Sequence, residues 1–365
     1  MTSMNRYRVR FIWIVLFCIV IGGVTVAVAQ DENTPVLAGI TDVEFVQWVT
    51  GPESPNQTDV NYQVLGTDLG SMFDLNGTIY IAFGDTFGCC RPAEGGGGGG
   101  QWRYNVVGYS TDHDLEDGMT LDGMITDEDG HARAVLRKKF EDFTIIPTAG
   151  IAVRDRMFLH YMAVREWGAP GHWTLNRSGW GYSDDQGETW MQPLDSVWEG
   201  DTNFGMAALL EHEDYVYVFG THGGRYSGVQ LARVPAEPDT VLDMTAYTYW
   251  NGEGWSDNMA DAVEIVPAPV GEVSVAWNAF LGRWLMIYLD EPRRGIVIRE
   301  APELTGTWSE PQMLVDSADF PSLYGSYFHP WASDGEVVYF TMSQWGPYNV
   351  MLMRARLVKD QQAAH

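Results

Sequence analysis

Residues 70–83 read GSMFDLNGTIYIAF and hold two short apolar segments on either side of Asn76-Gly77. An Asn-Gly pair between alternating apolar residues is a strong signal for a tight β-hairpin. Such a hairpin returns the chain to the end of the sheet from which it started. Asp68 precedes the first segment and Asp85 follows the second, so we expect both carboxylates at the same end of one sheet.

The same order of elements recurs four more times along the chain. Each copy has an apolar segment, a turn, an aromatic-rich segment and, after a loop, a third segment; the turns centre near residues 77, 155, 214, 282 and 335. Repeated sheets of three or four short strands are typical of a β-propeller. The sequence therefore predicts an all-β fold, a five-bladed β-propeller, with a β-sandwich as the alternative architecture.

Residues 183–190, SDDQGETW, match the S-x-D-x-G-x-T-W pattern of the Asp box. This motif resembles the one that turns outer hairpins in sialidase-like propellers. There the aspartate binds the amides of the turn and the tryptophan packs between sheets. We expect Asp185 to have this structural role and no catalytic one.

Residues 1–29 have the pattern of a secretory signal peptide. Three arginines precede an apolar run that ends in Ala27-Val28-Ala29. An uncleaved N-terminal anchor is the alternative, because the run approaches the length that spans a bilayer. We expect residues 30–65 to lead into the propeller or to close its ring, residues 66–358 to form the propeller, and residues 359–365 to be a tail. A secreted or cell-surface location follows.

The chain is strongly acidic. Its 365 residues include 22 basic and 49 acidic side chains, a net charge of −27. Residues 1–29 contain three of the basic residues and no acidic one, so the remainder carries a net charge near −30. This field repels nucleic acid and anionic membranes. The expected partner is a polysaccharide; no nucleic acid and no stable membrane partner are expected if the signal is cleaved, and the chain is expected to be a monomer.

No cofactor or metal is expected from the motifs. There is no Cys/His zinc spacing, no phosphate loop and no dinucleotide fingerprint. The acidity would suit a structural calcium ion, but no EF-hand-type loop supports one. Cys89 and Cys90 are adjacent, and a strained vicinal disulfide and two unpaired thiols both remain open.

Propeller geometry selects the candidate catalytic residues. If the first strand of each blade starts at one mouth, the second strand ends there, which places Asp68, Asp85 and Glu272 at that mouth. Paired carboxylates are what acid–base and nucleophilic chemistry on a glycosidic bond requires. The alternatives are that both aspartates are turn formers next to glycine, and that Glu272 is a solvated residue at a strand edge.

Rings and polar groups near the same mouth are candidate sugar ligands. Aromatic rings stack on the C–H faces of sugars while polar groups bind hydroxyls. The candidate substrate-binding residues are Arg165, Trp167, His172, Trp173, His222, Arg225, His329 and Trp345. Packing of Trp167, bracing of a loop by His222 and a core position for His329 are the alternatives. Asp290 is interpreted as part of an acidic turn and His160 as a core residue.

Four motifs resemble a known family. They are GTDLG at 66–70, FGDTFG at 83–88, LHYMAVR at 159–165 with Gly171-His172-Trp173, and YFTMSQWGPYN at 339–349. From residue 66 to 357 the chain is similar to the bacterial domain-of-unknown-function family 4185, which is linked to glycoside hydrolase family 183, the endo-D-arabinanases. The resemblance implies a five-bladed propeller that cleaves internal α-linkages of D-arabinofuranan, the arabinan of mycobacterial-type cell walls. It carries over Asp68 and Asp85 alone.

Three functions are consistent with these features. The first is a secreted glycoside hydrolase that cleaves within a furanose polysaccharide, an endo-D-arabinanase-like enzyme. The second is a non-catalytic, lectin-like propeller, which would keep the tryptophans without needing paired acids. The third is a sialidase-like hydrolase, suggested by the Asp box and disfavoured by the small number of arginines.

Overall fold

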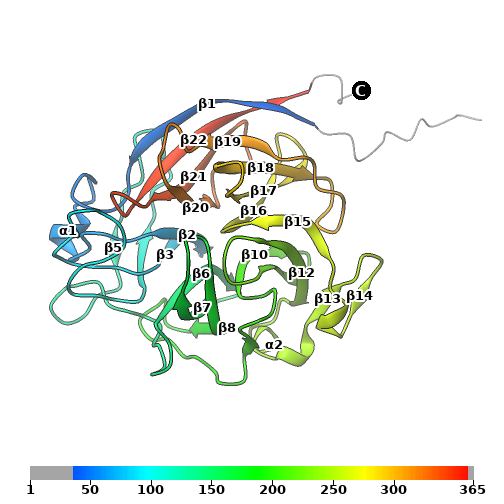
Figure 1. Cartoon of the computed structure of the whole chain (residues 1–365), viewed down its shortest axis with the longest axis horizontal. Coiled ribbons are helices and arrows are strands. Elements are labelled where there is room, and N and C mark those ends of the chain that lie inside the picture. The colour runs from blue at the N-terminus through cyan, green and yellow to red at the C-terminus, as the bar shows by residue number, and fades with distance from the viewer. Residues whose placement is uncertain (1–35, 361–365) are drawn as a thin grey trace, which may run out of the picture. The chain divides into compact units, whose positions relative to one another are not determined.

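Five antiparallel sheets surround a common centre in residues 36–360, the part of the chain that the computed structural model describes (Figure 1). Their innermost strands are β2 (Leu69–Leu75), β6 (Thr144–Val153), β10 (Met206–His212), β16 (Val273–Asn278) and β20 (Leu323–Phe328). Each innermost strand contacts the next, and β20 contacts β2, so the ring is closed. The predicted five-bladed β-propeller is confirmed and the sandwich is excluded.

The remaining strands extend each sheet outward. The first sheet continues with β3 (Thr78–Phe83), β4 (Val106–Ser110) and β5 (Gly123–Met124). The second continues with β7 (Arg156–Trp167), β8 (Trp173–Ser183) and β9 (Val197–Glu199). The third has β11 (Tyr215–Thr221), β12 (Ser227–Pro235), β13 (Thr248–Trp250), β14 (Trp255–Ser256) and β15 (Glu264–Val270). The fourth has β17 (Arg283–Asp290), β18 (Gly295–Ala301) and β19 (Gln312–Asp316).

The fifth sheet joins the two ends of the described chain. It contains β20, β21 (Val337–Gln344), β22 (Asn349–Lys359) and β1 (Leu37–Trp48), and β1 pairs antiparallel with β22. Of the two alternatives for residues 30–65, the structure shows the one in which this segment closes the ring, because β1 supplies the outer strand of this sheet. Pairing with β1 also removes an exposed edge from β22.

The hairpin between β2 and β3 has the predicted turn. Asn76 and Gly77 both have positive φ, 53° and 81°. Two such residues form a type I′ turn, whose twist matches that of the flanking strands. Leu75 pairs with Thr78 directly across this turn, so the register of the first sheet is fixed here.

The hydrophobic core consists of clusters between neighbouring sheets. Phe73, Ile145 and Leu159 belong to one cluster, which joins the first two sheets. Phe158 and Phe204 belong to another, which joins the second and third sheets. Helices contribute little among the described residues; the elements are α1 (Thr58–Asn61), α2 (Pro238–Val241) and the 3-10 turns η1 (Met244–Ala246) and η2 (Met259–Asp261).

The Asp box forms the expected turn after β8. Asp185 accepts hydrogen bonds from the amide and the hydroxyl of Thr189, at 2.8 and 2.6 Å. The indole of Trp190 donates to the carbonyl of Gly187 at 2.9 Å. These contacts give Asp185 a structural role in the turn.

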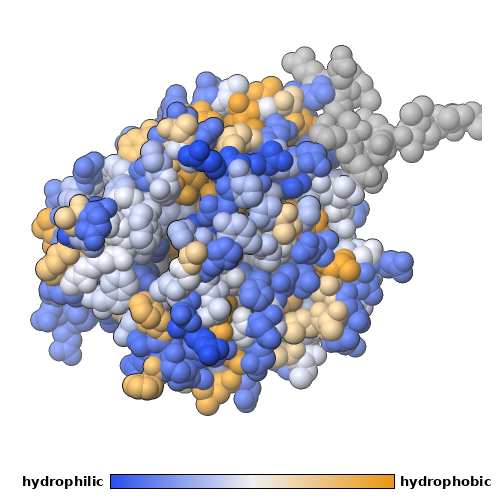
Figure 2. Space-filling view, viewed as in Figure 1, coloured by the Kyte–Doolittle hydropathy of each residue, from blue (hydrophilic) through white to orange (hydrophobic). Residues whose placement is uncertain are grey.

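Hydrophilic residues cover most of the face shown in Figure 2, with hydrophobic ones scattered among them. No helix within residues 36–360 has the length and apolar character needed to cross a bilayer. The expected signal peptide at residues 1–29 lies outside the described residues.

Candidate active site

Asp68 and Asp85 lie at the same end of the first sheet, as the hairpin predicts. Leu69, at the start of β2, pairs with Phe83, at the end of β3. The amide of Gly84 donates to the carbonyl of Asp68 at 3.1 Å. Both aspartate side chains are buried, and the charge of Asp68 raises the pKa of Asp85.

Asp68 is an acid held in a buried pocket of tyrosines. Its Oδ2 accepts a hydrogen bond from the hydroxyl of Tyr324 at 2.9 Å, and Tyr348 also donates to the carboxylate. Its Oδ1 is buried without a hydrogen-bond partner among the described residues. Burial and, to a smaller extent, the charge of Glu272 raise the pKa of Asp68 to about 7, against the lowering effect of the two tyrosines and Arg225. Asp68 is thus poised to hold a proton near neutral pH and to donate it.

Gly84 makes room for this carboxylate. A Cβ at this position would lie 2.3 Å from Oδ1 of Asp68, which is closer than two such atoms can approach. A side chain at residue 84 would therefore displace the acid or the strand end that carries it. The glycine in the 83–88 motif is therefore explained by the space that the carboxylate of Asp68 needs.

Asp85 is buried between the first and second sheets. It accepts hydrogen bonds from the hydroxyl of Thr144, at the start of β6, and from Trp102. Burial raises the pKa of Asp85 well above its ordinary value, and the charge of Asp68 raises it too. Burial and the charge of Asp68 therefore both disfavour ionisation of Asp85, so Asp85 is expected to stay protonated at neutral pH.

Glu272 precedes β16 and is held by Arg225. The guanidinium donates two hydrogen bonds to Oε1 of Glu272, at 3.0 and 2.9 Å, and a third to Oε1 of Glu291, at 2.9 Å. Burial alone would lower the pKa of Arg225, but the two glutamates raise it. Oε2 of Glu272 is buried and has no hydrogen-bond partner among the described residues. Glu272 is therefore ion-paired through one oxygen, while its other oxygen can contact a ligand.

Arg225 also links Glu272 to Asp68 through aromatic rings. Its guanidinium carbon lies 5.7 Å from the ring centre of Trp173 and 5.2 Å from that of Tyr324, whose hydroxyl contacts Asp68. We name Asp68, Asp85, Glu272, Arg225 and Tyr324 the acid cluster. With Thr144 and Trp173 of the second sheet beside it, all five sheets contribute to this end of the ring.

Most of the chain matches a known protein family. The model of a family described as "Domain of unknown function (DUF4185)" matches residues 53–354. This chain belongs to the DUF4185 family. No curated protein matches it at a significant level.

Three solved structures show the same fold at low sequence identity. A "putative hydrolase" from Bacteroides ovatus is 14% identical with a TM-score of 0.60, and the match covers 81% of this chain and 86% of that one. A family 117 glycoside hydrolase from Zobellia galactanivorans is 14% identical with a TM-score of 0.51, covering 88% and 92%. An exo-β-1,3-galactanase from Phanerochaete chrysosporium is 9% identical with a TM-score of 0.50, covering 87% and 64%. At these identities the similarity shows the architecture.

Several predicted ligand residues of this DUF4185 member lie around the acid cluster. Trp173 is buried against Arg225, and Trp167, which is exposed, meets it edge to face at 5.4 Å. His172 is exposed and stacks on Tyr226 at 4.4 Å. Aromatic rings therefore gather next to Arg225: Trp173 contacts its guanidinium, Trp167 contacts Trp173, and His172 stacks on the neighbouring Tyr226. Their role in binding substrate stays a prediction.

The other predicted ligand residues are more scattered. Arg165 is exposed near the end of β7. His222 directly follows β11, and its Nδ1 lies 3.0 Å from the carbonyl of Gly223. Trp345 is exposed and meets Tyr348 edge to face at 5.6 Å. Gly96, in the six-glycine run, approaches the indole of Trp345 so closely that a Cβ there would lie 2.7 Å from it.

His329 does not join the acid cluster. The chain enters β20 at Leu323, beside Tyr324, and His329 comes one residue after the opposite end of that strand. Its ring is buried and accepts from the amide of Trp331 at 3.3 Å, and burial lowers the pKa of His329 to about 4. The structure therefore supports the core alternative for His329. His160 is likewise fully buried, and burial lowers its pKa to about 3.

Four residues of the site were missed from the sequence. Thr144 and Trp102 bind Asp85, Tyr348 binds Asp68, and Glu291 binds Arg225. Tyr348 stands inside the 339–349 motif, so the resemblance offered a signal for it. Asp290, which was interpreted as part of an acidic turn, does bind Arg293 three residues on, at 3.2 Å.

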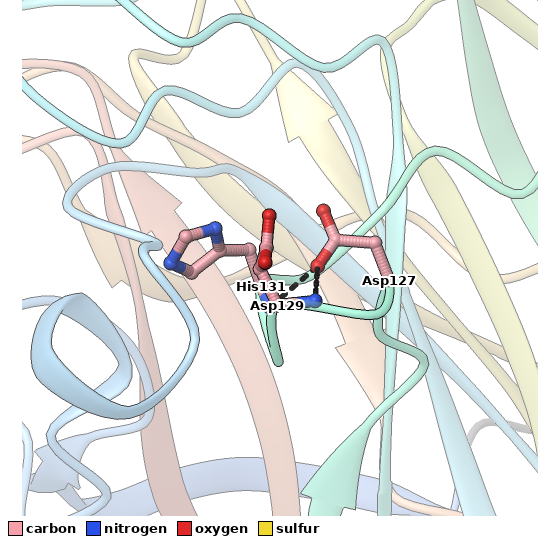
Figure 3. Close-up of side chains that lie close together, drawn as sticks. All are labelled: Asp127, Asp129 and His131. Atoms are coloured by element: carbon pink, nitrogen blue, oxygen red, sulfur yellow. Dashed lines mark hydrogen bonds between the residues drawn. The ribbon is translucent and has the colours of Figure 1, made fainter.

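One group of potential metal ligands lies apart from the acid cluster. Asp127, Asp129 and His131 place ligand atoms within 4.8 Å of one another (Figure 3). One oxygen of Asp127 already accepts from the amides of Asp129 and His131, at 3.0 and 2.9 Å. Both aspartates are exposed, so the group is explained as a hydrogen-bonded loop. Cys89 and Cys90 are free thiols in this structure, with their sulfurs 2.7 Å apart.

Proposed function

We propose that this protein is a secreted or cell-surface glycoside hydrolase that cleaves internal linkages of a furanose polysaccharide, D-arabinan of mycobacterial-type cell walls. The observation that carries the proposal is the combination, at one mouth of the propeller, of a buried acid whose pKa is raised and a glutamate that is ion-paired with arginine. Asp68 supplies the first and Glu272 the second. Glycosidases need these two functions on opposite sides of the scissile bond.

The proposed roles follow from the two environments. Asp68, with a pKa of about 7, protonates the oxygen of the leaving sugar as the glycosidic bond breaks. Glu272 offers Oε2 to the developing positive charge at the sugar carbon, or to the water that attacks it. Asp85, whose pKa is raised by burial and by the charge of Asp68, lines the site as a second, neutral acid. Trp173, Trp167 and Trp345 are the proposed sugar platforms.

Two kinds of similarity support the choice of substrate class. Two of the similar structures are named as glycoside hydrolases or galactanases, and the family motifs resemble those of endo-D-arabinanases. The sialidase alternative is weakened by the site itself, because Arg225 is engaged by Glu272 and Glu291 and is not free to clamp a substrate carboxylate. The lectin alternative keeps the rings but gives no reason for two buried carboxyl groups, Asp68 and Glu272, that each have one oxygen without a hydrogen-bond partner among the described residues.

The test is incubation of the purified protein with a panel of arabinans and other furanans, followed by analysis of product length. We expect internal cleavage of D-arabinan, with losses of at least about 1,000-fold in Asp68→Asn and Glu272→Gln. Asp85→Asn is expected to retain more activity than either, because an amide can replace a neutral carboxyl beside Asp68. Full activity in both Asp68→Asn and Asp85→Asn would overturn the site assignment. Binding without any cleavage across the panel would favour the lectin-like function.

A further inference from the structure

A second site lies between the third and fourth sheets, away from the acid cluster. The structure has a cavity of about 700 Å³ there, which is open to solvent. Its walls include Trp255, Trp277, Trp284, Tyr217 and His212. A cavity of this volume is within the range of small-molecule sites.

The cavity opens at the opposite end of the strands from the catalytic candidates. Glu272 comes directly before β16, whereas Trp277 is the fifth residue of that strand. At about 3.3 Å per residue, five residues separate the two along the strand by roughly 16 Å. In the third sheet, His212 lies at the hairpin end of β10, while the other end of that strand pairs with Thr221, next to His222. The cavity is therefore distinct from the acid cluster.

The tryptophans form a rigid, partly exposed platform. Trp277 pairs with Trp284 directly across β16 and β17, and their ring centres are 5.1 Å apart at 66°. His212 braces the other side of Trp284, at 4.9 Å and 76°. Trp284 is buried, whereas 41% of the surface of Trp277 is exposed. A fixed indole with an open face is suited to stacking on the C–H face of a sugar ring.

The rim of the cavity supplies acceptors for hydroxyl groups. Glu211, Glu213 and Glu303 are among the lining residues. Carboxylates accept hydrogen bonds from sugar hydroxyls, and they repel anionic ligands. All three are exposed at this rim, and the partial burial of Glu211 raises its pKa. The combination of an aromatic platform with acceptors selects a neutral, hydroxyl-rich ligand.

We propose that this cavity is a non-catalytic binding site for a short segment of neutral polysaccharide, on the opposite end of the propeller from the acid cluster. The identity of the sugar as arabinan rests on the proposed function; the site itself does not. Such a site would hold the protein on an insoluble polymer while the other mouth acts on a neighbouring segment. It would therefore matter for polymeric substrates and not for short soluble ones.

The experiment compares Trp277→Ala with Phe45→Ala, which removes an aromatic ring of 43% exposure from β1. Retention on insoluble polysaccharides and hydrolysis of soluble oligosaccharides are measured for both, with denaturation midpoints to confirm folding. We expect Trp277→Ala to weaken retention about tenfold and to leave the soluble rate within about twofold. Phe45→Ala should change neither, and Trp277→Phe should restore most of the retention.

The outcomes separate this site from the proposed function. Retention that depends on Trp277, without hydrolysis of any arabinan, would support the site and overturn the proposed function. Unchanged retention of folded Trp277→Ala on every polysaccharide tested would overturn the site, whatever the hydrolysis shows. Choline is the control for a cation held by the rings and carboxylates. Trp277-dependent binding of choline without binding of any saccharide would overturn the assignment to sugar.

Discussion

Replacement of Asp68 by asparagine should change how the stability of the protein depends on pH, and not only its activity. In the native state the pKa of Asp68 is about 7, against an ordinary value of 3.8, chiefly because the side chain is buried. The native state therefore holds the proton more tightly than the unfolded state does. The contribution of this group to stability is fully present below pH 3.8 and is lost as the pH rises towards 7.

The magnitude follows from the difference between the two pKa values. A shift of about 3 units at about 1.36 kcal/mol each predicts that an ionised Asp68 costs the native state about 4 kcal/mol at pH 8. At pH 5, closer to the ordinary value, the cost is about 2 kcal/mol. Asparagine cannot ionise. The free energy of unfolding of Asp68→Asn, relative to the wild type, should thus increase by about 2 kcal/mol between pH 5 and pH 8.

The assay is urea unfolding of both proteins at the two pH values. Any constant effect of the substitution, such as a changed hydrogen bond to Tyr324, cancels in the difference between the two pH values. Removing the charge of Asp68 also lessens the penalty on Asp85, which acts in the same direction. An equal difference between variant and wild type at pH 5 and pH 8 would show that Asp68 has no raised pKa, and the general-acid role would lose its basis.

Three further outcomes are expected. Gly84→Ala should lower hydrolysis about 100-fold by displacing Asp68, whereas Gly39→Ala, where a Cβ would meet no atom within 4 Å, should leave the rate unchanged. Arg225→Lys should also lower it about 100-fold, since an ammonium cannot reproduce the fork that holds both glutamates; a wild-type rate would contradict the proposed charge pair. Asp185→Ala should lower the urea midpoint by the equivalent of about 1 kcal/mol without affecting the specific activity, and a loss of activity in the folded variant would mean that the Asp box is not merely structural.

The repeat pattern predicted the blades because each copy is local. A turn with fixed chemistry, such as Asn76-Gly77, sets the register of its own hairpin, and the hairpin places Asp68 and Asp85 together. Glu272 could be placed by the same rule. Local patterns are therefore sufficient for residues next to strand ends.

Contacts between blades could not be predicted in this way. Arg225 comes from a loop of the third sheet and reaches Glu272 of the fourth and the ring of Tyr324 in the fifth. No spacing pattern in the sequence predicts contacts between residues of three different sheets. His329 was counted among the candidate ligands near the mouth, whereas β20 covers Leu323–Phe328 and His329 follows the end of that strand away from the acid cluster. The positive φ of Ser322 and Gly325 makes the start of that strand irregular.

The pairing of β1 with β22 fixes when the protein can finish folding. Residues 37–48 are synthesised well before their partner, residues 349–359. Ion pairs between β1 and β22, Arg354 with Glu44 at 2.5 Å and Arg356 with Asp42 at 3.0 Å, join the same distant segments. The fifth sheet therefore cannot be completed until residues 349–359 have been synthesised, and every earlier folding intermediate lacks the pairing that closes the ring.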